Sequence, residues 1–190
     1  MTQSASLELA TRSGLPDALR VLVEKYPRPG WEAHPEFNAL TRFWLDRHLM
    51  FRDVLGRLRT GSERYLDRQV DPRRHAAETA RYAGFLLNEL HGHHGIEDQH
   101  YFPALIGLDG RLLRGFELLD ADHHALDGHI HRMAETTNAF LQRLGDARER
   151  DRGADLAAAL ARFETFLDRH LTDEEDLVVP VILTYAPKLH

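Results

Sequence analysis

The chain of 190 residues contains no cysteine, which excludes disulfide bridges, thiolate metal sites and iron–sulfur clusters. No uninterrupted apolar run approaches roughly 18 residues, so no membrane span is expected. A basic region followed by an apolar one is also missing at the start, so we expect no signal peptide and a cytoplasmic protein. Positive charge is not in excess: 24 Lys and Arg against 30 Asp and Glu give a net charge of −6. This balance argues against nucleic acid or a membrane surface as a partner.

Signals for β-strands are nearly absent. The one β-branched run, residues 178–182, is interrupted by Pro180, which disfavours a strand. Apolar residues recur at helical spacing through most of the remaining chain. The pattern predicts an all-α fold, an up-down-up-down four-helix bundle with a short extra N-terminal helix.

The predicted bundle spans residues 35–180, between an N-terminal extension of residues 1–34 and a C-terminal tail of residues 181–190. Its long helices are expected at about 35–67, from 72 to near 103, from 109 to 145, and from just after 153 to just before 180. Asp71 and Pro72 are typical of an N-cap and a first helical turn. The extension carries the short helix, at 16–25, and is expected to pack across the end of the bundle; a docking helix is the alternative.

Histidine is abundant, with 13 residues, and two pairs of the form His-x-x-x-Glu stand out. They are His93 with Glu97 and His170 with Glu174, each followed by a short apolar run and a proline. Residues four apart share one face of a helix, so each pair can direct an imidazole and a carboxylate at one point. Two such helices predict a two-metal site inside a helical bundle.

The phase of the apolar stripes adds one histidine from each of the other long helices. His48 lies four residues after Trp44, and His123 lies four residues after Leu119. The predicted metal ligands are therefore His48, His93, Glu97, His123, His170 and Glu174.

Neighbouring residues fit the apolar faces less well. The phase favours His93 with Glu97 over His94 with Asp98, and within the acidic run 173–176 it selects Glu174 alone. The other nine histidines are interpreted as solvated or capping: 34, 75, 91, 94, 100, 124, 129, 131 and 190. Two buried carboxylates beside four imidazoles would be costly unless neutralised. Protonated carboxyls bonded to neutral imidazoles are one solution, and a pair of cations is the other.

These residues resemble the hemerythrin-like, or HHE cation-binding, domains over roughly residues 35–180. The resemblance rests on Phe-Trp-Leu-Asp-Arg-His at 43–48, His-His-Gly-Ile-Glu-Asp at 93–98, Asp-His-His-Ala-Leu at 122–126 and His-Leu-Thr-Asp-Glu at 170–174. It implies a non-haem di-iron centre, with two Fe ions bridged by two carboxylates and an oxo or hydroxo group, held by the six residues above. Mn or Zn could substitute, because imidazole and carboxylate without thiolate suit all three metals.

Two departures separate the chain from oxygen-carrying members of that family. Those proteins place a second histidine four residues after the ligand of the third helix, where this chain has Asp127. Their last carboxylate is an aspartate five residues after the histidine of the fourth helix, where this chain has Glu174 at four and Glu175 at five. The pattern is similar to the six-ligand bacterial and regulatory members. One imidazole fewer leaves a position for water, Asp127 or a small ligand, which favours redox reactivity over reversible oxygen carriage.

The resemblance implies a protein that binds or senses O2, iron or redox state, with a small diatomic such as O2 or NO, or peroxide, as ligand. An oxidoreductase consuming peroxide or nitric oxide is the alternative, followed by a metal-free interaction bundle and, more distantly, a zinc hydrolase. Tyr101 is either a group supporting the site or a core tyrosine. The expected walls of the site are Trp44, Phe51, Leu90, Leu126, Phe166 and Leu167.

Overall fold

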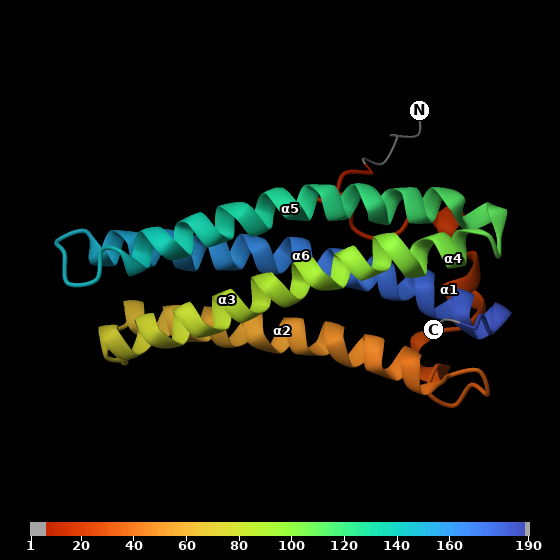
Figure 1. Cartoon of the computed structure of the whole chain (residues 1–190), viewed down its shortest axis with the longest axis horizontal. Helices are drawn as coiled ribbons and strands as arrows, with labels where there is room; N and C mark the ends of the chain where they lie inside the picture. Colours follow the sequence, from red (N-terminus) through yellow and green to blue (C-terminus); the bar gives the residue numbers. More distant parts are fainter. Residues whose placement is uncertain (1–6, 189–190) are drawn as a thin grey trace. The chain divides into compact units, whose positions relative to one another are not determined.

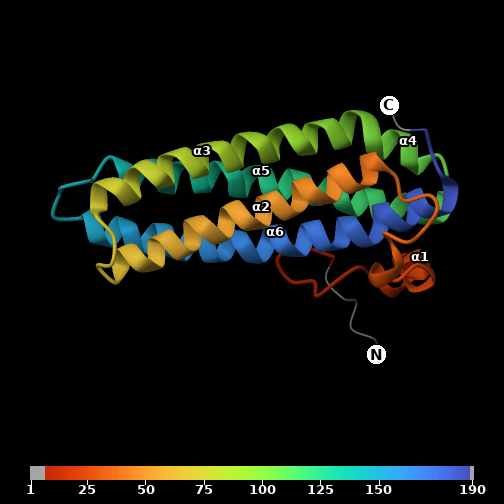
Figure 2. The same cartoon turned by 90° about the horizontal axis from the view of Figure 1, so that it is seen from below.

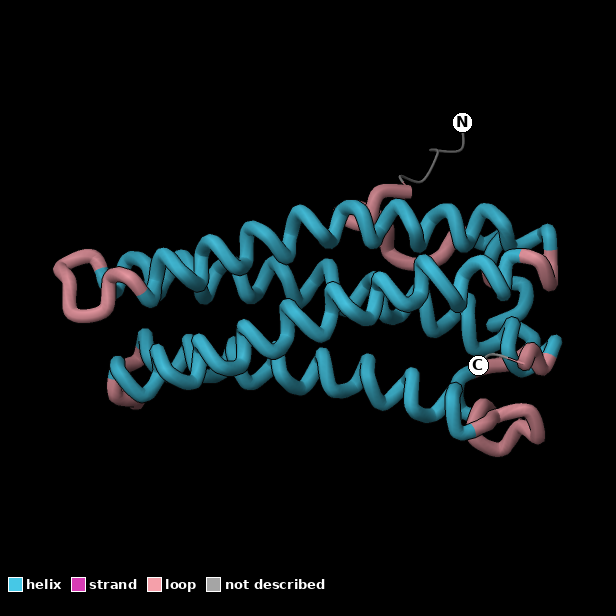
Figure 3. Tube along the Cα trace, in the orientation of Figure 1, coloured by secondary structure: helices cyan, strands magenta, loops and turns pink. Residues whose placement is uncertain are grey.

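The computed structural model describes residues 7–188, and all regular secondary structure among them is helical (Figures 1 and 3). Its long helices are α2 (Ala39–Leu66), α3 (Pro72–Ile96), α5 (Leu113–Leu141) and α6 (Glu149–Tyr185). The short elements are η1 (Asp17–Leu19), α1 (Val21–Lys25), η2 (Arg28–Gly30), η3 (Glu97–Tyr101), α4 (Phe102–Ile106) and η4 (Gly110–Leu112). Within the described chain, none of these helices has the length and apolar character needed to cross a membrane.

Contacts divide the described chain into two compact units. The first unit holds residues 7–48, 94–125 and 168–188, and the second holds residues 49–93 and 126–167. Each unit contains part of each of the four long helical segments of the chain. Within each unit, these parts pack side by side (Figure 2). Short connections, residues 67–71 and 142–148 in the second unit, join antiparallel neighbours. The predicted all-α four-helix bundle with a short extra N-terminal helix is confirmed.

The N-terminal extension supplies part of the first unit's apolar core. Leu15, Leu19, Leu22 and Trp31 are buried in one cluster with residues of α2, α4, α5 and α6, such as Leu177. Burial of a Leu side chain contributes about 1.5–3 kcal/mol, so four large apolar groups fix the extension firmly. This agrees with the expected packing of the extension on the bundle rather than with a free docking helix. The second unit has its own core, in which Phe51, Leu86, Phe140 and Phe163 are almost fully buried.

Local chemistry sets the helix ends. Asn38 caps α2, because its Oδ1 accepts a bond of 2.9 Å from the Thr41 N–H; the helix therefore starts at Ala39, later than predicted. Asp71 caps α3 as predicted, accepting from the N–H of residue 74 at 2.9 Å. The fourth helix starts at Glu149, four residues before Gly153, so the predicted start was wrong. Gly153 lies inside the helix, at a place where the Tyr65 ring occupies the space that a side chain would need.

Two prolines lie inside helical segments, one of which was expected to end near Pro103 and the other before Pro180. Pro103 follows the π-helical turn η3, in which the Phe102 N–H bonds to the Glu97 carbonyl five residues back. The wider turn adjusts the hydrogen bonding just ahead of the residue that has no N–H. Pro180 is enclosed in α6, which runs on to Tyr185. A proline costs a helix about 3 kcal/mol, but residues 177–183 are all buried, and their packing outweighs that cost.

Candidate metal centre

Six ligand-type side chains gather in the first unit. They come from α2, α3, η3, α5 and α6, and none is more than 3 % exposed: His48, His94, Glu97, His123, His170 and Glu174. Five of them are residues that helical phase selected. The sixth, His94, was interpreted as solvated or capping, and its 3 % exposure shows that this interpretation was wrong.

Glu174 and Glu97 face the imidazoles. One oxygen of Glu174 lies 3.3 Å from Nε2 of His170 and 3.7 Å from Nε2 of His48. An oxygen of Glu97 lies 3.7 Å from Nε2 of His123. The other Glu97 oxygen accepts a hydrogen bond of 2.6 Å from the indole N–H of Trp44, which fixes the orientation of the carboxylate.

A carboxylate lies at the other ring nitrogen of three of the histidines. Nδ1 of His48 is 3.0 Å from Glu175, Nδ1 of His123 is 2.7 Å from Asp98, and Nδ1 of His170 is 3.4 Å from Asp122. An ionised carboxylate only accepts hydrogen bonds, so it favours the tautomer with the proton on Nδ1. The lone pair is then on Nε2, which points toward the buried glutamates. The same carboxylate–histidine arrangement orients imidazoles that ligate metals.

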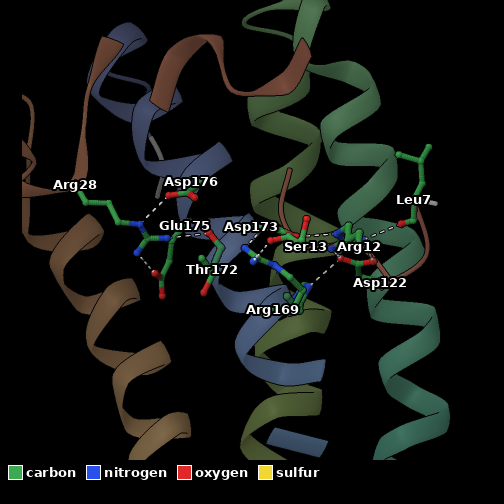
Figure 4. Close-up of polar contacts among 11 residues, drawn as sticks. Leu7, Arg12, Ser13, Arg28, Asp122, Arg169, Thr172, Asp173, Glu175 and Asp176 are labelled. Carbon is green, nitrogen blue, oxygen red and sulfur yellow. Dashed lines mark hydrogen bonds and ion pairs between the residues drawn. The ribbon is translucent and has the colours of Figure 1, made fainter. Parts of the chain in front are cut away.

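Two arginines of the N-terminal extension contact two of these carboxylates, Asp122 and Glu175 (Figure 4). Arg12 donates from Nη1 to Oδ1 of Asp122 at 2.7 Å, and from Nε to Oδ2 of Asp173 at 2.7 Å. Arg28 donates to Glu175 at 2.5 Å and to Asp176 at 2.8 Å. Asp122 thus links Arg12 to His170, and Glu175 links Arg28 to His48.

The acidic run 173–176 is more buried than expected. Asp173 is 0 % and Glu175 4 % exposed, so the interpretation of these two residues as solvated was wrong, while Asp176 is half-buried. The reason is the N-terminal extension: Arg12 and Arg28 lie more than 140 residues from these partners along the chain and supply the compensating charge. The alternation of apolar residues within one helix contains no signal for such partners.

The structure also places His93, Asp127 and His75. His93 is 8 % exposed and lies in the second unit, where its ring is 5.2 Å from Phe51; it stands four residues before Glu97 on the same helical pass. Asp127 is exposed and lies 3.7 Å from His91, which is itself exposed, so a place for Asp127 in the coordination sphere is not supported. His75 is also buried, at 2 % exposure, and stacks on Tyr65, contrary to the solvated interpretation.

The buried groups fit a cation. Both Glu174 oxygens and the Nε2 atoms of His123 and His170 are buried and make no hydrogen bond with any described residue. Burial raises the pKa of Glu174 well above its ordinary value, and the charge of Glu97 adds to the effect. Burial likewise lowers the pKa of His170. Buried carboxylates and neutral imidazoles whose facing atoms make no hydrogen bond are the donor set that a divalent metal completes.

A small cavity of about 20 Å³ reaches Glu97 in the first unit. It has room for about one molecule of the size of water. Its exposed lining is apolar, and its walls are formed by Leu40, Thr41, Trp44, Glu97, Tyr101, Phe102, Leu105, Val178 and Ile182. Tyr101 therefore borders the cavity beside Glu97.

A helical bundle that buries imidazoles together with carboxylates defines a class of cation-binding proteins. The chain belongs to the hemerythrin family: residues 39–182 match the Hemerythrin HHE cation binding domain. No curated protein and no solved structure gives a significant match to the chain.

Proposed function

We propose that this hemerythrin-family protein holds two iron ions and uses them to bind or sense a small oxidant, O2 first among them. The observation that carries the proposal is the buried pair Glu97 and Glu174, which faces three imidazole Nε2 atoms, those of His48, His123 and His170. Each carboxylate has two oxygens and can bridge two metals. His93 joins the proposed ligands because it lies one helical turn before Glu97.

The bound iron would supply ligand binding and reversible electron exchange. The chain's own residues prepare the site for this chemistry. Trp44 orients Glu97 through its indole N–H, and the carboxylates at Nδ1 direct the three Nε2 lone pairs inward. Burial excludes bulk water, which strengthens the electrostatic interactions of every charged group inside.

The cavity beside Glu97 favours a diatomic ligand over peroxide. It is small, and its exposed surface is apolar, so it stabilises O2 or NO better than a polar molecule that would leave its hydrogen bonds unmade. An oxidoreductase that consumes nitric oxide or peroxide on the same site is the second candidate. Turnover of either compound by the iron-loaded protein, lost on substitution of His170 by alanine, would favour it.

The test adds Fe(II) to the metal-free protein without oxygen and then admits air. We expect two iron ions per chain by metal analysis and a new visible absorption band on oxidation. Glu174→Gln keeps the shape of the side chain but removes its charge, so it should abolish binding of both ions if Glu174 bridges them. Glu117→Gln, at an exposed position on α5, is the matched control and should behave as wild type. Wild-type protein that takes up no iron and develops no band would overturn the proposal.

A further inference from the structure

A larger cavity lies in the second unit and includes none of the proposed metal ligands. It is an open groove of about 600 Å³ between α2 and α3, a volume that suits a small organic molecule. Gly56 and Gly61 line its α2 side, and a side chain on Gly56 would meet nothing within 4 Å. The two glycines thus leave space between the helices.

The walls of the groove are single stripes of the two helices. Arg57, Thr60 and Arg64 are spaced three and four residues apart, so they share one face of α2. His75 and Tyr82 are seven residues apart and line the groove from α3. Polar side chains of both helices therefore converge on one space.

Two of these side chains carry positive charge that the described chain does not neutralise. Arg57 and Arg64 are exposed, and their guanidinium groups form no hydrogen bond or ion pair with any described residue. Arg59 lies between them in the sequence but outside the groove, and it forms ion pairs with two glutamates. The two arginines of the groove are therefore available to an anion.

The two acidic residues of the groove leave this charge in place. Glu78 is already paired with Arg74, at 3.0 Å. Asp53 stands 11 residues before Arg64, which is about 16 Å along α2. The unpaired positive charge is therefore greatest around Thr60 and Arg64, at the end of the groove away from Asp53.

His75 adds a buried polar group at the same end. It is 2 % exposed, and its Nε2 has no hydrogen-bond partner among the described residues. Its Nδ1 lies 3.6 Å from the point where a Cβ on Gly61 would stand, so this edge of the ring meets the groove across a glycine. Burial lowers the pKa of His75, and a neutral imidazole keeps one N–H to donate.

We propose that this groove binds a small organic anion whose phosphate or carboxylate group lies at Thr60, between Arg57 and Arg64. Guanidinium groups bind both kinds of acidic group through paired N–H donors, and the Thr60 hydroxyl adds another donor. His75 contacts the acidic group from α3. The organic part lies along Tyr82, whose ring offers an apolar surface. The proposal goes beyond the metal-based function and does not depend on it.

The test titrates the ¹⁵N-labelled full-length protein with phenyl phosphate and with benzoate at constant ionic strength, followed by NMR. We expect saturable binding of at least one probe, with shifts at the Gly61 amide and the His75 ring. Arg64→Gln should weaken binding at least about tenfold, because it removes a charged pair of donors. Arg59→Gln is the matched control, since it removes the same charge from α2 outside the groove, and it should change binding by less than about twofold.

Gly56→Leu tests the groove by its shape. The new side chain meets no neighbour, so the urea midpoint should not fall, but it occupies the space beside Tyr82 and should weaken binding of the probe. Tighter binding of phenyl phosphate supports a phosphate ligand, and tighter binding of benzoate supports a carboxylate. The proposal is overturned if neither probe saturates below about 10 mM, or if Arg64→Gln and Arg59→Gln bind equally well.

Discussion

Removing Arg12 should destabilise the metal-free protein more than removing any exposed arginine. Its side chain is 3 % exposed, and its partners Asp122 and Asp173 are 3 % and 0 % exposed. Asp173 keeps a second partner in Arg169, at 2.5 Å, but Asp122 would be left with only the weak donor of His170 at 3.4 Å. Breaking a buried ion pair on one side costs about 3–5 kcal/mol, so we expect Arg12→Ala to lose that much.

Arg28→Ala is the matched control. It also removes an arginine of the extension that bonds two carboxylates, but the Arg28 side chain is 40 % exposed. Solvent reaches Arg28, and the buried Glu175 keeps a donor in Nδ1 of His48 at 3.0 Å, so removal of Arg28 should cost about 1–2 kcal/mol, less than removal of Arg12. Urea unfolding followed by far-UV circular dichroism, with a chelator present, measures both. With a urea dependence of about 1–3 kcal/mol per molar, Arg12→Ala should lower the midpoint by at least about 1 M.

The double variant Arg12→Ala/Asp122→Asn tests why Arg12→Ala loses stability. If the loss comes from an uncompensated buried charge, removing that charge should restore part of the stability. The reasoning is refuted if Arg12→Ala costs no more than Arg28→Ala, or if the second substitution only adds to the loss.

Two further predictions concern packing and pH. A methyl group on Gly115 would lie 2.8 Å from Leu177, so Gly115→Ala should destabilise by about 1–3 kcal/mol, whereas Gly84→Ala, in open space on α3, should stabilise by about 0.5–1 kcal/mol in the same urea assay. Equal effects of the two substitutions would contradict the close approach at Gly115. Burial, with the hydrogen bond to Glu149, raises the pKa of Tyr65 to about 12. The native state then resists ionisation that the unfolded chain undergoes near pH 10, so stability should fall as pH rises from 10 through about 12, and less so in Tyr65→Phe.

Helical phase predicted most of the buried site because each long helix has a single apolar face. His48, His123, His170 and both glutamates lie where that periodicity places inward residues, and all are buried. Helical phase did not identify His94 as buried, and the reason lies in the local backbone. His94 was set aside as a pair with Asp98, but the helix changes to a π-helical turn at Glu97, so a strict 3.6-residue period does not describe where Asp98 lies relative to His94.

The charged groups around the site could not be predicted in the same way. Neither Asp122 nor Glu175 was predicted from the sequence to have a role in the site. Nothing on their own helices explains why a carboxylate should be buried at these positions. Their partners Arg12 and Arg28 lie 110 and 147 residues away along the chain. Periodicity reports which face of a helix is covered, and it carries no information about which distant residue covers it.

The two arginine contacts of the N-terminal extension also constrain the order in which the protein folds. Arg12 is synthesised 161 residues before Asp173, its partner on the last helix, so this contact closes one of the longest loops in the chain. Until α6 exists, Arg12 can contact Asp122 of α5 but not Asp173, and Arg28 has neither Glu175 nor Asp176 to bond. Two of the contacts that orient the site histidines, His48 with Glu175 and His170 with Asp122, also need α6, so uptake of metal by the fully oriented site should follow assembly of the last helix.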